Sequence, residues 1–139
     1  MGTRRQQRAG SLNFRMNQEI KKIWVDALTS GEFQQGRGSL HNKDEYCCLG
    51  VLCELHRRIT NQGKWVPLKN FDTTIAHQKS YQYVINEDDK GIFYLPIAVM
   101  EWAELSASNP QINLIPLGAY NDSRPYNFQQ IAKLIDQNL

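Results

Sequence analysis

The sequence predicts an α+β fold in which about four helices pack with a small antiparallel sheet as a single compact domain. Three observations support this prediction. Apolar residues recur with helical spacing near both ends of the chain, and a cysteine-rich apolar segment follows the first of these helices. Short runs of aromatic and β-branched residues lie between residues 64 and 95. A length of 139 residues is typical of one domain.

The first helix is expected over residues 18–29, because its apolar residues recur at the i, i+3, i+4, i+7, i+8 spacing of one buried face. These residues are Ile20, Ile23, Trp24, Ala27 and Leu28. Asn17 is a competent N-cap, and Gly31 suits the position after the C-cap.

Residues 32–43 are expected to form a loop around Gly36, Arg37 and Gly38. Two glycines beside an arginine let backbone amides approach an anionic ligand, but the segment matches neither a P-loop nor a dinucleotide fingerprint. We therefore interpret it as a plain connection and keep Arg37 as a candidate ligand- or partner-binding residue.

A second helix is expected from Tyr46 to Leu55, with Asp44 as its N-cap. It is apolar nearly all round, which is typical of the central buried helix of a small domain. Gly50 costs about 1 kcal/mol relative to alanine inside a helix. We therefore expect another segment to pack closely against the backbone at Gly50.

After residue 63 the apolar residues no longer recur with helical spacing and instead form short runs typical of strands. Residues 65–66, 81–85 and 92–95 read as strands, and the last two flank a hairpin loop at 86–91. Pro67 indicates that the first of these strands is brief or lies at an edge.

Two further helices and one extended segment are expected towards the C-terminus. Pro96 opens a helix at a first-turn position, residues 112–117 form an extended segment, and the last helix begins near Phe128 with Asn127 and Gln130 placed like a capping box. The inward-facing residues of these two helices are expected to be Val99, Trp102 and Ala103, then Phe128, Ile131, Ala132 and Ile135.

The positive charge is concentrated at the N-terminus. Residues 1–15 contain four arginines and no acid, whereas residues 16–139 contain twelve Lys or Arg against fourteen Asp or Glu. We expect residues 1–15 to be a basic flexible tail or leader and residues 16–139 to be the globular domain. Arg4, Arg5 and Arg8 make the tail a candidate nucleic-acid binder, because arginines neutralise phosphates.

Cys47, Cys48 and Cys53 lie within seven residues, an odd number that is a poor disulfide framework and favours reduced, structural thiols. The enzymatic alternative is a cysteine hydrolase. A cysteine in the first turn of a helix gains thiolate character, so Cys48 is its candidate nucleophile and His77 the candidate base. His77 lacks the strand context and the following polar residue that this mechanism needs.

A zinc site is a weaker alternative. It would draw on Cys47, Cys48, Cys53 and His56, with His41 from the preceding loop. The segment contains no Cys-x-x-Cys pair, and adjacent residues on one helix diverge by about 100°. No metal and no cofactor are therefore expected.

Aromatic and polar residues give further binding candidates. Trp65 and three tyrosines, Tyr81, Tyr83 and Tyr94, are candidates for stacking on a base, although aromatic residues in strands more often pack in cores. Asn121 and Asp122 are expected in a loop, where they would either bind a partner or form a turn.

Four stretches resemble a family of small uncharacterised proteins from tailed bacteriophages and prophages. They are residues 27–36, residues 46–53, Tyr94-Leu95-Pro96 with Trp102-Ala103, and Tyr120-Asn121-Asp122 before residues 128–135. The Tyr-Cys-Cys-Leu-Gly-Val-Leu-Cys motif of residues 46–53 is the most specific. The resemblance covers nearly all of residues 16–139 and implies a phage origin without implying a reaction.

These features favour a non-enzymatic phage accessory protein in the host cytoplasm. It would bind a host factor, a defence component or a small signalling molecule. No apolar run reaches the roughly 20 residues of a membrane helix, so no membrane partner is expected. The alternatives are the hydrolase using Cys48 and nucleic-acid binding through the tail.

Overall fold

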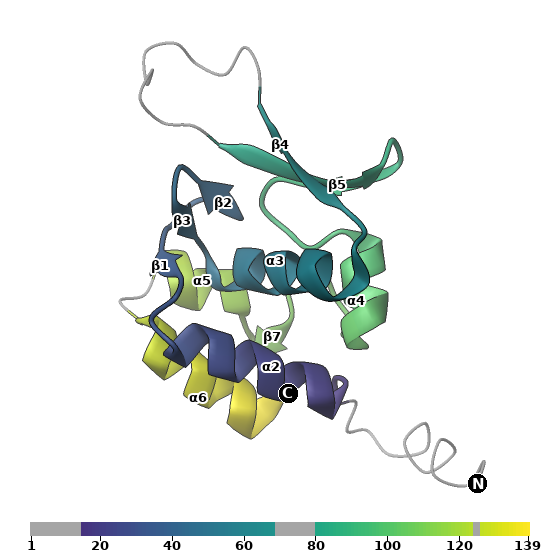
Figure 1. Ribbon diagram of the computed structural model, residues 1–139. Helices are drawn as coiled ribbons and strands as arrows, with labels where there is room; N and C mark the ends of the chain where they lie inside the picture. The colour runs from purple at the N-terminus through teal and green to yellow at the C-terminus, as the bar shows by residue number, and fades with distance from the viewer. Residues whose placement is uncertain (1–14, 69–79, 124–125) are drawn as a thin grey trace, which may run out of the picture.

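Helix α3 (Cys48–Thr60) runs through the middle of the molecule, with two helices on one side and a small sheet on the other (Figure 1). The computed structural model describes residues 15–68, 80–123 and 126–139. These residues form a single α+β domain, as the sequence predicts. The remaining helices are α2 (Gln18–Thr29), α4 (Ile97–Ala103), α5 (Leu117–Asp122) and α6 (Phe128–Asn138).

The described strands are short and form three small sheets. Their bounds are β1 (Gln34–Gln35), β2 (His41–Asn42), β3 (Glu45–Tyr46), β4 (Lys64–Pro67), β5 (Tyr81–Asn86), β6 (Asp89–Gly91), β7 (Gln111–Ile112) and β8 (Ile115–Pro116). The sheet orders are β1-β3-β2, β4-β5-β6 and β7-β8. All pairs are antiparallel except β1 with β3, which is parallel.

Helices α2 and α6 pack against each other on one side of α3 (Figure 1). Both helices follow the sequence prediction: Asn17 caps α2, and Asn127 with Gln130 forms a complete capping box on α6. One expectation for α2 was wrong, because Ile23 is 39 % exposed instead of facing the core. The indole of the fully buried Trp24 donates to the Cys48 carbonyl oxygen at 3.0 Å, and this bond fixes α2 against α3.

Helix α3 begins later than the sequence predicts. Its N-cap is Cys47 and not Asp44, because residues 41–46 form the antiparallel pair β2–β3 ahead of the helix. The expected close packing at Gly50 is confirmed. A Cβ atom at that position would overlap the backbone carbonyl of Leu40.

The sheet β4-β5-β6 covers the other side of α3, with β4 at its edge as Pro67 indicates. The predicted hairpin exists, but its second strand is Asp89–Gly91 and residues 92–95 are irregular. Tyr83 in β5 is fully buried, and its hydroxyl group hydrogen-bonds His56 Nδ1 at 2.7 Å and donates to the Gln62 carbonyl at 3.0 Å.

The segment from residue 111 to residue 122 also differs from the prediction. Instead of one extended stretch it forms the β7–β8 hairpin and then helix α5, so Asn121 and Asp122 lie in a helix and not in a loop. Helix α5 packs against α3 and α6.

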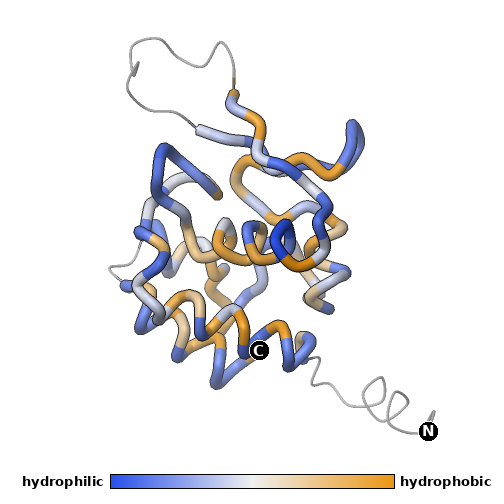
Figure 2. Tube along the Cα trace, in the orientation of Figure 1, coloured by the Kyte–Doolittle hydropathy of each residue, from blue (hydrophilic) through white to orange (hydrophobic). Residues whose placement is uncertain are grey.

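The hydrophobic core lies around the first half of α3. Figure 2 shows this half of the helix as mainly hydrophobic, whereas the hairpin turns at the surface are hydrophilic. Within the described residues, no helix has both the length and the apolar character that crossing a membrane requires.

Candidate functional site

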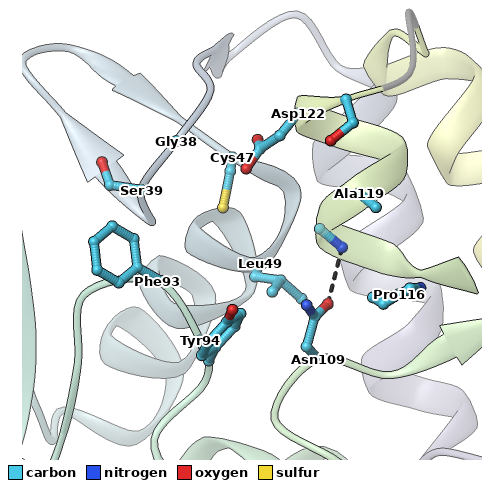
Figure 3. Close-up of a pocket in the computed structure, with 12 residues that line it drawn as sticks. Gly38, Ser39, Cys47, Leu49, Phe93, Tyr94, Asn109, Pro116, Ala119 and Asp122 are labelled. Carbon is cyan, nitrogen blue, oxygen red and sulfur yellow. Dashed lines mark hydrogen bonds between the residues drawn. The ribbon is translucent and has the colours of Figure 1, made fainter.

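A pocket of about 310 Å³ opens between helix α5, the start of α3 and the loop that follows β6. Figure 3 shows Phe93 and Tyr94 on one side and α5 on the other, with Cys47 and Leu49 between them. The lining residues are Gly38, Ser39, Cys47, Leu49, Phe93, Tyr94, Asn109, Pro116, Gly118, Ala119, Asp122 and Ser123. They come from segments that are far apart in the sequence, so the pocket exists only in the folded chain.

The Phe93–Tyr94 segment is held at both ends by backbone hydrogen bonds. The Ile92 carbonyl accepts from the Leu40 N–H at 2.8 Å, and the Leu95 N–H donates to the Ser108 carbonyl at 3.0 Å. The two aromatic side chains are nevertheless 51 % and 54 % exposed. Large aromatic groups on a fixed backbone provide a preformed contact surface.

Ser39 lies deeper in the wall of the pocket. It is 8 % exposed, and its hydroxyl group makes no hydrogen bond within the described part of the chain. Most buried polar side-chain atoms in proteins have a hydrogen-bond partner, because leaving one unpaired costs about 1–3 kcal/mol. The Ser39 Oγ is itself almost completely buried, so a ligand could reach this hydroxyl group only if the wall of the pocket moved.

Asn121, near the C-terminal end of α5, connects this helix to neighbouring segments through the hydrogen bonds of its side chain. Its Oδ1 accepts from Gln35 Nε2 at 3.0 Å and from the Cys48 N–H at 3.2 Å. Its Nδ2 donates to the Gly36 carbonyl at 2.8 Å and to Asp122 Oδ1 at 2.8 Å. The side chain is fully buried, so Asn121 is an internal clamp, whereas Asp122 is exposed and lines the pocket.

The cysteines lie in two environments. Cys47 lines the pocket, where burial raises the pKa of its thiol to about 12, and its Sγ accepts from the Gly50 N–H at 3.4 Å. Cys48 is fully buried, and burial raises the pKa of its thiol well above the ordinary value. Neither thiol has the thiolate character that a nucleophile needs. The candidate base His77 lies outside the described residues.

The residues of the zinc alternative do not converge. His56 bonds Tyr83, and His41 stacks between Tyr46 and Tyr81, with ring centroids 4.0 and 4.4 Å away. Across the described ranges, no group of three or more His, Cys, Asp or Glu side chains is arranged to hold a metal ion.

The other sequence candidates are spread over the molecule. The Trp65 indole donates to Glu54 Oε1 at 2.9 Å and packs near His41, so it belongs to the sheet and not to the pocket. Of the aromatic stacking candidates, only Tyr94 lines the pocket. Arg37 is exposed next to Gly38, which does line it. Arg4, Arg5 and Arg8 lie outside the described residues.

Sequence reasoning missed Ser39, Phe93 and Asn109. Asn109 Oδ1 accepts from the Gly118 N–H at 2.9 Å, which fixes the start of α5 against the preceding loop (Figure 3). No local pattern identifies these three residues, because their significance comes from burial and from neighbours that are distant in the sequence.

The fold and the pocket together define a small α+β protein with a preformed, partly aromatic cavity. The chain belongs to the family described as Domain of unknown function (DUF8296), which it matches over residues 16–139. A search of curated proteins and a search of solved structures found no match. Any statement about function therefore depends on the pocket itself.

Proposed function

We propose that this protein is a non-enzymatic binding protein that holds a small organic molecule in the pocket between α5 and the Phe93–Tyr94 segment. The observation that carries the proposal is the pair of half-exposed aromatic side chains that a fixed backbone holds at the edge of the pocket. A ligand would bury the two rings, and the burial of apolar surface favours binding.

Binding is a better account than catalysis. Covalent catalysis by a cysteine needs a thiolate and a base within hydrogen-bond reach. Cys47 keeps its proton because burial raises its pKa to about 12, and within the described residues no histidine lines the pocket. The same residues place no metal-binding cluster there.

The resemblance to tailed-phage proteins supports one setting for this binding. The ligand would be a small signalling molecule in the cytoplasm of an infected bacterial cell, and the protein would act as an accessory factor by sequestering it. The support for this setting is the motif at residues 46–53 and the small size of the domain. The pocket is the part of the proposal that can be tested with purified protein.

The test is a fragment screen by ligand-observed NMR on the full chain and on two variants. Phe93→Ala removes a ring from the pocket wall, and Ile59→Ala removes a side chain of similar exposure from the end of α3. We expect some fragments to bind the wild type and the Ile59→Ala variant but not Phe93→Ala. A diverse library that yields no binder, or binders unaffected by Phe93→Ala, would refute the proposal.

A further inference from the structure

Within the described residues, Asp122 is the one charged side chain that lines the pocket. Cys47 adds no charge because its thiol stays protonated, and the described part of the chain places no Lys, Arg or His in the lining. Among the described lining residues, an anionic ligand would meet a carboxylate and no compensating cation. The charge of the pocket therefore favours a positively charged ligand.

The N-terminus of α3, which borders the pocket, does not offset this preference. Helix N-termini bind anions through free backbone N–H groups. Here the Cys48 N–H donates to Asn121 Oδ1 and the Gly50 N–H donates to Cys47 Sγ. Because the protein itself satisfies these donors, they are not available to a phosphate or a carboxylate.

The two aromatic rings form a corner across from Asp122. The ring centroids of Phe93 and Tyr94 are 6.5 Å apart and their planes meet at 61° (Figure 3). The face of an aromatic ring attracts ammonium and guanidinium groups. Asp122 is held in place by its hydrogen bond from Asn121 Nδ2, so a cation in the corner would have a carboxylate opposite it.

We propose, building on the binding function proposed above, that the ligand of this pocket carries an organic cation, either an ammonium or a guanidinium group. The cation lies in the corner formed by Phe93 and Tyr94 and faces the Asp122 carboxylate. A neutral ligand of the same shape binds less well, because it would partly desolvate Asp122 without compensating its charge.

Two matched pairs of probes test the charge preference by NMR titration of the full chain. Choline is compared with neohexyl alcohol, in which a tert-butyl group replaces the trimethylammonium group, and propylguanidine is compared with propylurea. We expect at least one cation to bind about tenfold more tightly than its neutral partner, the factor that corresponds to a cation–π contact plus a charge pair. Added salt should weaken cation binding and leave the neutral compounds unaffected.

Asp122→Asn removes the charge and keeps an amide oxygen that can accept from Asn121, so the fold should persist. The control is Asp26→Asn, at an exposed acid on α2 whose carboxylate forms a 3.5 Å ion pair with Lys22. We expect Asp122→Asn to abolish the preference for cations and Asp26→Asn to preserve it.

The outcomes separate this inference from the function on which it rests. Neutral partners that bind as tightly as the cations, or a cation preference that survives Asp122→Asn, would overturn the cation assignment and leave a small-molecule pocket in place. If neither these probes nor any library fragment binds the folded protein, the proposed function is wrong and the cation assignment falls with it.

Discussion

At Gly50, helix propensity and tertiary packing favour different residues. Alanine is better than glycine inside a helix by about 1 kcal/mol. A Cβ atom at Gly50, however, would overlap the Leu40 carbonyl, which also accepts from the Cys47 N–H at 3.1 Å. Because the obstacle is backbone, we expect Gly50→Ala to lower the free energy of unfolding by about 1–3 kcal/mol, as overpacking does. Urea denaturation followed by circular dichroism measures the change.

Ile59→Ala is the control for Gly50→Ala, since Ile59 lies on the same helix and is 52 % exposed. Its effect should stay within about 0.5 kcal/mol. A Gly50→Ala protein that is more stable than the wild type would mean that the Leu40 backbone moves away at little cost.

Glu54 is a buried carboxylate whose charge is neutralised by its neighbours. It accepts hydrogen bonds from Arg57 at 2.9 and 2.6 Å, from Arg58 Nε at 2.9 Å and from Trp65 Nε1 at 2.9 Å. Burial alone would raise the pKa of this carboxyl, but the hydrogen bonds from Arg57, Trp65 and Arg58 outweigh that effect and lower the pKa to about 2.

The lowered pKa of Glu54 predicts acid sensitivity. Between the ordinary pKa of 4.5 and the folded value of about 2, the unfolded chain binds more protons than the folded one, so stability falls as the pH drops. We expect the wild type to have a higher free energy of unfolding than Glu54→Gln. This difference should be largest above pH 4.5 and should shrink steadily as the pH falls below that value. Urea denaturation at several pH values measures this. Glu19→Gln, at an exposed acid on α2, is the matched control.

The sequence identifies part of the pocket for a physical reason. Asp122 and Tyr94 are residue types that bind ligands wherever they are accessible, so composition alone makes them candidates. Ser39 is a common loop residue, and it becomes informative only because the fold buries its hydroxyl without a partner. For Asn121 the sequence is misleading in the opposite direction. Its residue type suggests a binding group at the surface, but in the fold both polar atoms of its side chain hydrogen-bond other parts of the protein.

Among the elements, α4 depends on a residue from another element for its start. Its N-cap is Pro96, which has no side-chain acceptor. Asp89 in β6 compensates, since its Oδ1 accepts from the Ile97 N–H at 2.7 Å and its Oδ2 from the Ala98 N–H at 2.8 Å. A carboxylate at this position satisfies two free donors and interacts favourably with the helix dipole.

Asp89→Ala should therefore destabilise the protein by about 1–2 kcal/mol, the usual cost of losing a cap. The loss should be local, with faster amide hydrogen exchange at Ile97 and Ala98. Asp88→Ala, one position earlier in the exposed turn, should leave both amides protected. Equal protection in the two variants would mean that α4 does not need the Asp89 carboxylate.

The length of an element decides whether its sequence predicts it. Helices α2 and α6 span several turns, so their apolar period and caps are readable, and the N-caps of both and most of their buried residues agree with the prediction. Helix α5 has six residues and β2 and β3 have two each, which is too short for a period to appear. The N-cap of α3 was misplaced for this reason, since the β2–β3 pair occupies the residues that resemble a helix start.

At the scale of the whole molecule, the N-terminal end of the described domain is hydrogen-bonded to its C-terminal end. Met16 is 2 % exposed, and its N–H donates to the Leu139 carbonyl at 3.1 Å. Met16→Ala should therefore cost about 2–5 kcal/mol as a buried truncation. A chain beginning at Met16 should melt within a few degrees of the full chain, because residues 1–15 contain few apolar side chains to bury.

Differential scanning calorimetry of the full chain, of Met16→Ala and of the chain beginning at Met16 measures both changes in melting temperature. If the chain beginning at Met16 melts as low as Met16→Ala, residues 1–15 contribute to the stability of the domain, and the boundary at residue 16 is misplaced.

The packing of α2 against α6 has a consequence for how the protein is made. The apolar face of α2 emerges early from the ribosome, but its partner begins only at Phe128. At a synthesis rate of about 5–20 residues per second, that face waits on the order of 5–20 s for its cover. During this interval the side of α2 that packs on α6 is free to contact other nascent chains, so the yield of native protein should depend on chaperones and on translation speed.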